Sequence, residues 1–253
     1  MPAPAEEPAP AAEPAPAAEE PAAAEEADEA RDLLDYTDDM YRGLSSHATL
    51  TMNVKTARWE RSITLEAWSL GEEKSLMVIR APAKEAGMAT LKVDDNIWNY
   101  LHKVDRTMKV PASMMSGSWM GSHFTNDDLV KDSRMADDYD YRITSRPEDN
   151  EAGEFVIECI PRPDAPVVWG KVLVRIDGEA RIPTEITYWD EKGNLKRSMT
   201  FLDFREVGGR TIAGKMRLLP ADEPDEFTEV VYDEIEFDLE LPESTFTLQA
   251  LKR

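Results

Sequence analysis

Apolar and polar residues alternate over most of this chain, and this alternation constrains the fold more than any other feature. Leu50, Met52 and Val54 are separated by threonine and asparagine, and the same period of two recurs in many segments as far as residue 241. A period of two is typical of a β-strand with one buried face. Clusters of glycine, proline, asparagine and aspartate separate the segments, so the pattern predicts about 11–12 strands.

Two segments carry specific expectations. Trp98 and Tyr100 stand two residues apart after the Asp-Asp-Asn turn at 94–96, so they share one face of a strand. Bulky side chains on the concave side of a curved sheet can enclose an apolar cavity, which makes both residues candidate ligand contacts. In the last strand, one face is expected to hold five apolar residues, which are Val231, Ile235, Phe237, Leu239 and Leu241.

A sheet with one-sided alternation is antiparallel, and its apolar face needs a cover. Residues 32–44 supply part of it, because Leu33, Met40 and Leu44 recur at helical spacing and Gly43 stands at the expected end. One helix of this length cannot shield so many strands, so the sheet must curve upon itself. The predicted fold class is mainly β, of the α+β type, with an N-terminal helix.

A methionine-rich segment at 108–130 interrupts the alternation. Its large apolar side chains are Met114, Met115, Trp119, Met120 and Phe124. Thioether and aromatic groups on a glycine-containing backbone can form an adaptable apolar surface. They can equally be ordinary core beneath a loop, and the sequence leaves both interpretations open. These five residues, with Trp98 and Tyr100, form the candidate ligand-binding set.

Residues 1–30 differ from the rest of the chain in composition. They contain nine carboxylates, no lysine or arginine and no aromatic residue, so we expect a disordered Ala/Pro/Glu-rich spacer ahead of one domain at 31–253. Stretches of this type often follow a cleaved export signal, and we expect that a signal peptide or lipobox has been removed. The net charge of −22 argues against nucleic-acid partners.

Groups paired for catalysis are not visible in the sequence. The three histidines, His47, His102 and His123, lack the spacing of a paired metal motif, and no G-x-S-x-G elbow occurs. Cys159 is the single cysteine and stands in an apolar strand, which indicates an inert core thiol. We therefore expect a binding protein rather than an enzyme, without a cofactor.

The residues that follow His123 allow two interpretations. With Asn126, Asp127 and Asp128, this histidine could form a metal site. Thr125 or Asn126 as a helix N-cap, with the two aspartates in the first turn, explains the same residues better. We expect no metal site.

Several short motifs resemble the bacterial outer-membrane lipoprotein-sorting proteins, the LolA-like family in its longer branch. The most specific is the run at 116–125, Ser-Gly-Ser-Trp-Met-Gly-Ser-His-Phe-Thr. The other matches are Pro82 with Gly87, residues 98–101, 127–129, 138–139 and 188–190, Gly193 before 195–196, and 246–247. The resemblance covers roughly residues 32–253.

This resemblance implies an incomplete, highly curved antiparallel β-barrel, with short lid helices over an apolar cavity. It implies a non-enzymatic periplasmic carrier in the Gram-negative envelope that shuttles acyl chains of a lipoprotein or lipid toward the outer membrane. An inner-membrane transporter and an outer-membrane acceptor would be its partners, and the carrier would be a monomer. An alternative is a tethered regulatory, sensor or transporter-accessory module on the same fold. No arginine is carried over from the family.

Overall fold

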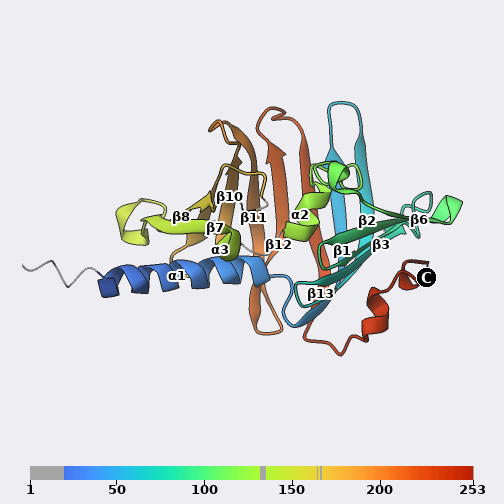
Figure 1. The fold of residues 1–253 in the computed structure, drawn as a ribbon, viewed down its shortest axis with the longest axis horizontal. Coiled ribbons are helices and arrows are strands. Elements are labelled where there is room, and N and C mark those ends of the chain that lie inside the picture. The colour runs from blue at the N-terminus through green and yellow to red at the C-terminus, as the bar shows by residue number, and fades with distance from the viewer. Residues whose placement is uncertain (1–19, 132–134, 164, 166, 253) are drawn as a thin grey trace, which may run out of the picture.

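The computed structural model describes residues 20–131, 135–163, 165 and 167–252. Within them, thirteen strands form a single antiparallel sheet, accompanied by three α-helices and short 3-10 turns (Figure 1). The helices are α1 (Glu20–Asp39), α2 (Asn126–Lys131) and α3 (Met135–Asp138). The mainly β fold with an open, curved antiparallel sheet is therefore confirmed.

The first strands are β1 (Ser45–Lys55), β2 (Glu60–Leu70), β3 (Lys74–Ala81), β4 (Ala89–Val93), β5 (Asn96–Leu101) and β6 (Arg106–Lys109). The remaining strands are β7 (Tyr139–Ser145), β8 (Glu154–Pro161), β9 (Lys171–Asp177), β10 (Pro183–Trp189), β11 (Leu195–Val207), β12 (Arg210–Pro220) and β13 (Phe227–Phe237). The sequence predicted twelve of these thirteen. It missed β6, whose side chains are mostly exposed and so show no apolar alternation.

The order of the strands explains why the sheet is open. It runs β6-β5-β4-β3-β2-β1-β13-β12-β11-β10-β9-β8-β7, so every strand pairs with a neighbour in the chain except where β1 meets β13. The two edges are β6 and β7, which are consecutive in the sequence. Residues 110–138 join these edges, and we call this connection the cover segment.

The N-terminal helix differs in extent from the prediction. It begins at Glu20, so residues 20–30 of the predicted spacer are helical; residues 1–19 lie outside the described residues. Alanine and glutamate favour helix, and Ala30, Leu33 and Leu34 are buried against the sheet. The helix ends at Asp39 rather than at residue 44, and Leu44 is 78% exposed because the chain has already left the helix.

The last strand corrects a second prediction. Between Thr49 and Leu50 of β1 the pairing shifts, which leaves Asp233 of β13 as an extra residue. Such a bulge exchanges the two faces of a strand. Val231 and the buried Ile235 consequently lie on opposite faces of β13. The strand ends at Phe237, before Leu239 and Leu241.

Three apolar clusters form the core. Two of them, centred on Leu33 with Ile157 and on Met52 with Leu65, lie on the inner face of the sheet beneath α1 and the cover segment. The third contains Leu91 and lies on the outer face of β3 to β5, where the C-terminal segment packs. Both faces of this part of the sheet are therefore buried, which one-sided alternation did not predict.

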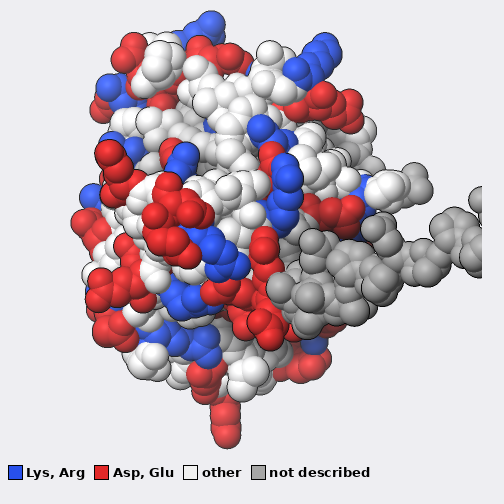
Figure 2. Space-filling view, turned by 90° about the vertical axis from the view of Figure 1, so that its left-hand side faces the viewer, with Lys and Arg blue, Asp and Glu red and all other residues white. Residues whose placement is uncertain are grey.

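Charged side chains of both signs are interspersed on the face shown in Figure 2. Ion pairs also form along the β7–β8 edge of the sheet, where Arg142 lies 2.6 Å from Glu158 and Arg162 lies 3.1 Å from Asp140. Because exposed pairs are hydrated and screened by salt, each stabilises the fold by no more than about 1 kcal/mol. The excess of carboxylates leaves no broad basic patch on this face.

Candidate functional site

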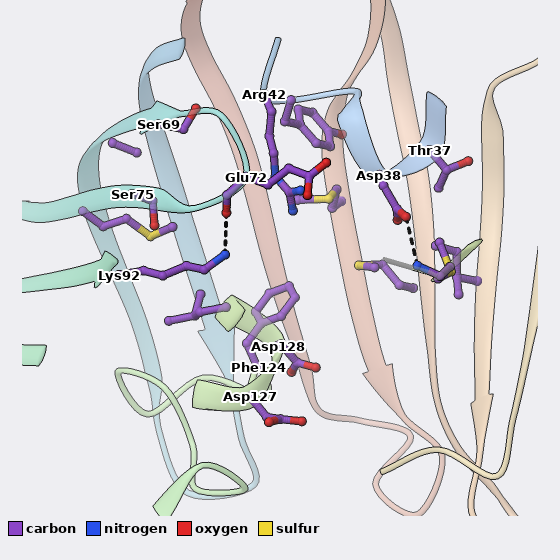
Figure 3. Close-up of a pocket in the computed structure, with 18 of the residues that line it drawn as sticks. Thr37, Asp38, Arg42, Ser69, Glu72, Ser75, Lys92, Phe124, Asp127 and Asp128 are labelled. Atoms are coloured by element: carbon purple, nitrogen blue, oxygen red, sulfur yellow. Dashed lines mark hydrogen bonds between the residues drawn. The ribbon is translucent and has the colours of Figure 1, made fainter. Parts of the chain in front are cut away.

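A cavity of about 250 Å³ lies between the inner face of the sheet and the segments that cover it (Figure 3). Apolar side chains from β1 to β3 and from β9 to β13 line its sheet side: Ala48, Leu50, Ala67, Met77, Val172, Ile186, Met199, Phe201, Met216 and Tyr232. Phe124, Leu129 and Met135 line it from the cover segment. The volume is slightly below the roughly 300–1,000 Å³ of typical ligand pockets.

Polar groups gather at the rim of this cavity. Asp38 accepts a hydrogen bond from the main-chain N–H of Met135 at 3.1 Å, which joins α1 to the cover segment. Lys92 is buried and donates to the main-chain oxygen of Glu72 at 2.6 Å (Figure 3). The cavity thus combines an apolar interior with a charged and hydrogen-bonded rim.

Stacked aromatic rings fix the chain that directly follows α1 against the sheet. The rings of Tyr41 and Tyr232 lie 4.3 Å apart and almost parallel, and both line the cavity. The Tyr41 hydroxyl donates to the main-chain oxygen of Ala213 at 2.8 Å. This contact holds one wall of the cavity in place.

An arginine that the sequence did not single out lies in the wall of the cavity. Arg197 on β11 is 7% exposed, and its guanidinium donates two hydrogen bonds to Asp128 of α2, at 2.8 and 2.6 Å. The guanidinium also lies 4.6 Å from the ring centre of Trp169 and 4.5 Å from that of Tyr188. A charged group that contacts two adjacent rings and a carboxylate is strongly oriented. It connects the cover segment to the sheet.

A signal for this arginine is present in the sequence. Arg197, Met199 and Phe201 alternate along β11, and all three line the cavity. A charged side chain at an apolar position of an alternating strand needs a buried partner. The pattern therefore marks Arg197, although it does not identify Asp128.

Short-range hydrogen bonds order the cover segment. The N–H of Thr125 donates to Asp128 Oδ2 at 2.7 Å, and the N–H of Asp128 donates to Thr125 Oγ1 at 3.2 Å. This reciprocal pair caps α2, so the predicted N-cap is confirmed with Thr125 in that position. Upstream, the N–H of Trp119 donates to the oxygen of Phe124 at 2.8 Å. The glycine-containing run is a closed, hydrogen-bonded loop.

The structure separates the five candidates from this segment. Phe124 lines the cavity, and Trp119 is 5% exposed within the core, where its Nε1–H donates to Thr90 at 3.2 Å. Met120 packs against the same core cluster. Met114 is 59% exposed, and neither it nor Met115 is among the residues lining the cavity.

Trp98 and Tyr100 share one face of β5, as expected, but this is the outer face of the sheet. Both belong to the apolar cluster that contains Leu91 and Leu251 and that lies beneath the C-terminal segment. The cavity lies on the other side of the sheet. The periodicity shows that two residues share a face, but it does not show which layer that face meets.

Burial governs the chemistry of the single thiol. Cys159 is fully buried, and burial, reinforced by the negative charges of Asp38 and Glu158, raises the pKa of its thiol to about 12. The thiol therefore stays protonated near neutral pH and is a poor nucleophile.

Among the described residues, no helix combines the length and the apolar composition needed to cross a bilayer.

Solved structures share this architecture. A domain from Vibrio parahaemolyticus, described as an outer membrane lipoprotein-sorting protein, is 24% identical, with a TM-score of 0.75 over 91% of this chain and 100% of its own. A DUF1329 family protein from Desulfovibrio piger is 20% identical, with a TM-score of 0.78 over 89% of this chain and 99% of its own. A LolA superfamily protein from Nitrosomonas europaea is 19% identical, with a TM-score of 0.72 over 87% of this chain and 98% of its own.

These similarities define the class: the chain has the LolA-like fold found in lipoprotein-sorting proteins. A family model described as "-like: Uncharacterized protein" matches residues 71–253, and the chain belongs to that family. The comparison with curated proteins found no match.

Proposed function

We propose that this chain is a non-catalytic carrier that works in the bacterial periplasm and holds acyl chains of a lipoprotein or lipid. The observation that carries the proposal is the cavity of about 250 Å³ with an apolar lining from eight strands and the cover segment. Each CH₂ group that leaves water for such a lining contributes about 0.8 kcal/mol. About ten buried methylenes would contribute about 8 kcal/mol, which corresponds to micromolar, reversible binding.

The polar rim suits a ligand with a polar head. A chain that enters between the sheet and the cover segment would leave its head group near Lys92 and Glu72, where charged and main-chain groups replace water. A chain longer than the cavity needs the cover segment to move. Its contacts with the sheet through Asp38 and Arg197 are hydrogen bonds that can break and form again.

The direction of transport forms the second part of the proposal. The carrier would receive cargo from an inner-membrane transporter and pass it to an acceptor at the outer membrane. Support comes from the fold, which it shares with a domain described as an outer membrane lipoprotein-sorting protein. The excess of carboxylates would keep a monomeric carrier from adhering to anionic lipid surfaces during transit.

A cavity-filling substitution tests the carrier proposal. Ala67 on β2 lines the cavity, and Ser62 on the same strand is exposed. We expect Ala67→Trp to weaken binding of a fluorescent fatty acid about tenfold or more, because displacing only two CH₂ groups costs about 1.6 kcal/mol. Ser62→Trp is the matched control and should leave the affinity unchanged.

Mass spectrometry of the natively purified chain is the accompanying measurement. We expect co-purified acyl lipid in the wild type and less of it in Ala67→Trp. A wild-type chain that carries no lipid and does not bind the fluorescent probe would contradict the proposal. Equal affinities of the two tryptophan variants would place the binding site elsewhere.

A further inference from the structure

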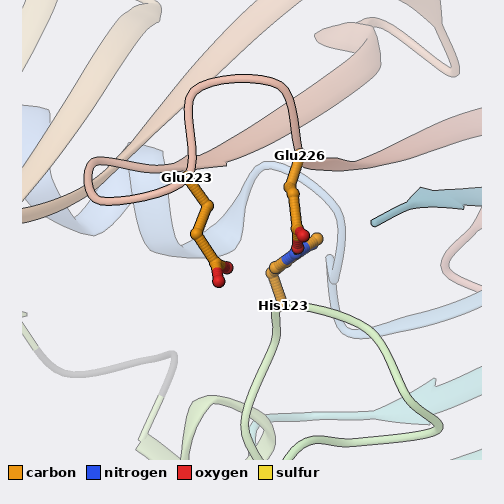
Figure 4. Close-up of side chains that lie close together, drawn as sticks. All are labelled: His123, Glu223 and Glu226. Atoms are coloured by element: carbon orange, nitrogen blue, oxygen red, sulfur yellow. The ribbon is translucent and has the colours of Figure 1, made fainter. Parts of the chain in front are cut away.

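A histidine and two glutamates meet outside the cavity, where the cover segment approaches the turn between β12 and β13 (Figure 4). His123 belongs to the cover segment, and Glu223 and Glu226 belong to the turn. One ligand atom from each side chain lies within 4.8 Å of the other two, and His123 Nε2 is 3.1 Å from Glu226 Oε2. A histidine and two glutamates that follow it by 100 and 103 positions thus present three metal-binding atoms to a common point.

The histidine is held on its far side. Its main-chain N–H donates to Thr228 Oγ1 at 2.9 Å, and its Nδ1 lies 2.8 Å from the same oxygen. Thr228 is fully buried and its position is fixed by β13. When Nδ1 carries the proton and donates it to this hydroxyl, the lone pair of Nε2 points toward the glutamates. A metal-binding histidine is commonly oriented by a hydrogen bond of this kind from its other nitrogen.

The inner glutamate is also oriented. Glu226 Oε1 accepts the main-chain N–H of Ala57 at 2.7 Å, which leaves Oε2 directed at the imidazole. The side chains of His123 and Glu226 are only 13% and 12% exposed. Glu223 is exposed, so it brings a second carboxylate to a partly desolvated site. Two carboxylates in one site repel each other unless a cation or a proton lies between them.

We propose that His123, Glu223 and Glu226 bind a divalent transition-metal ion of the zinc type. Zinc takes imidazole nitrogen and carboxylate oxygen at about 2.0–2.2 Å in a tetrahedral arrangement, which places ligand atoms about 3.3 Å apart. Only the flexible Glu223 side chain has to move by a small distance to reach that spacing. Three protein ligands leave the fourth position to water. The mixed nitrogen and oxygen donors favour such an ion over magnesium or calcium.

The bound ion would join the cover segment to the sheet. His123 is the residue before Phe124, which lines the cavity, and Glu226 directly precedes β13. The metal therefore adds a contact that is independent of the Arg197 pair. This inference does not depend on lipid binding, because the site lies apart from the cavity lining.

Titration of the untagged, chelator-treated chain with Zn²⁺ tests the site. We expect saturable binding of one ion per chain by calorimetry and a rise in melting temperature. Glu223→Gln should weaken binding about tenfold or more, because loss of even an outer partner of a ligand costs about 10–100-fold. Asp225→Asn removes the same charge from an exposed position of the same turn and should bind Zn²⁺ as the wild type does.

Two results would overturn the assignment. One is the absence of saturable zinc binding by the wild type. The other is equal zinc affinity of Glu223→Gln and Asp225→Asn, which would attribute binding to the general acidity of the surface. Glu223 is exposed, so its substitution tests the site without disturbing the core.

Discussion

Arg197 and Asp128 join the sheet to its cover: two hydrogen bonds of 2.8 and 2.6 Å connect the guanidinium to the carboxylate. The two residues are 69 positions apart, and the pair lies at the wall of the cavity. The rings of Trp169 and Tyr188, which lie 5.2 Å apart, both contact the guanidinium. Opening of the cover segment therefore requires this pair to separate.

Removing the arginine should destabilise the fold strongly. We expect Arg197→Met to lower the free energy of unfolding by about 3 kcal/mol, because it leaves the Asp128 carboxylate, which is only 15% exposed, without its counter-ion. This loss of about 3 kcal/mol is at the low end of the range for removing one partner of a buried ion pair, because Asp128 still accepts a hydrogen bond from the N–H of Thr125. Urea denaturation measures the change. Arg142→Met breaks an exposed pair with Glu158 and should cost less than about 1 kcal/mol.

Two residues of the methionine-rich segment should behave differently. Trp119→Ala should lower the free energy of unfolding by about 3–5 kcal/mol, because the side chain is 5% exposed and fills the core. Met114→Ala, at a position that is 59% exposed, should change it by less than about 0.5 kcal/mol. Thermal or urea unfolding distinguishes the two. Similar small effects would show that Trp119 moves freely in the cover.

The outer apolar cluster allows stability and binding to be separated. Phe246 packs on the same cluster as Trp98 and Tyr100, on the face of the sheet away from the cavity. We expect Phe246→Ala to lower the free energy of unfolding by about 3–5 kcal/mol while the affinity for a fluorescent fatty acid stays unchanged. A selective loss of affinity would mean that the ligand binds beneath the C-terminal segment.

Acid should weaken the attachment of α1. Glu29 pairs with Arg146 at 2.8 Å and with Arg181 at 3.2 Å, and the hydrogen bond from Arg146 lowers the pKa of this carboxyl below its ordinary value. The folded state thus favours the carboxylate, so its stabilisation is present above the ordinary pKa of about 4.3 and is lost as the pH falls below it.

Melting curves at two pH values check this dependence. Glu29→Gln should lower the melting temperature at pH 7, where the pairs contribute about 1 kcal/mol or less, and the difference from the wild type should shrink as the pH falls from about 4.3 toward 3. Asp28→Asn, at an exposed position of the same helix, is the control. A difference that persists unchanged at pH 3 would exclude the ion pairs as its cause.

Alternation predicted the strands well because each buried face repeats every second residue. It failed where a strand buries little, as in β6, and where a bulge changes the face, as at Asp233. It also could not show that Trp98 and Tyr100 face the C-terminal segment, because that contact joins distant parts of the chain. Local patterns determine strands, whereas the pairing of layers depends on long-range packing.

The candidate site was predictable to a smaller extent. The sequence identified the segment that covers the sheet and one lining residue, Phe124. It did not identify the Arg197 pair or the meeting of His123 with Glu226, since each joins residues distant in the sequence. Such pairs become visible only when the topology brings β11 and β13 beneath the cover segment.

The strand order has a mechanical consequence. Because the cover segment is attached to β6 at one end and to β7 at the other, it cannot swing outward as a flap hinged at a single point. We expect that lifting it draws on the two edges, so that access to the interior and the curvature of the sheet change together. Spin labels at the exposed Arg106 and Arg142 would record this as a change in edge-to-edge distance on loading. The work of admitting the proposed ligand would then be shared among the strands of the sheet rather than concentrated in one hinge.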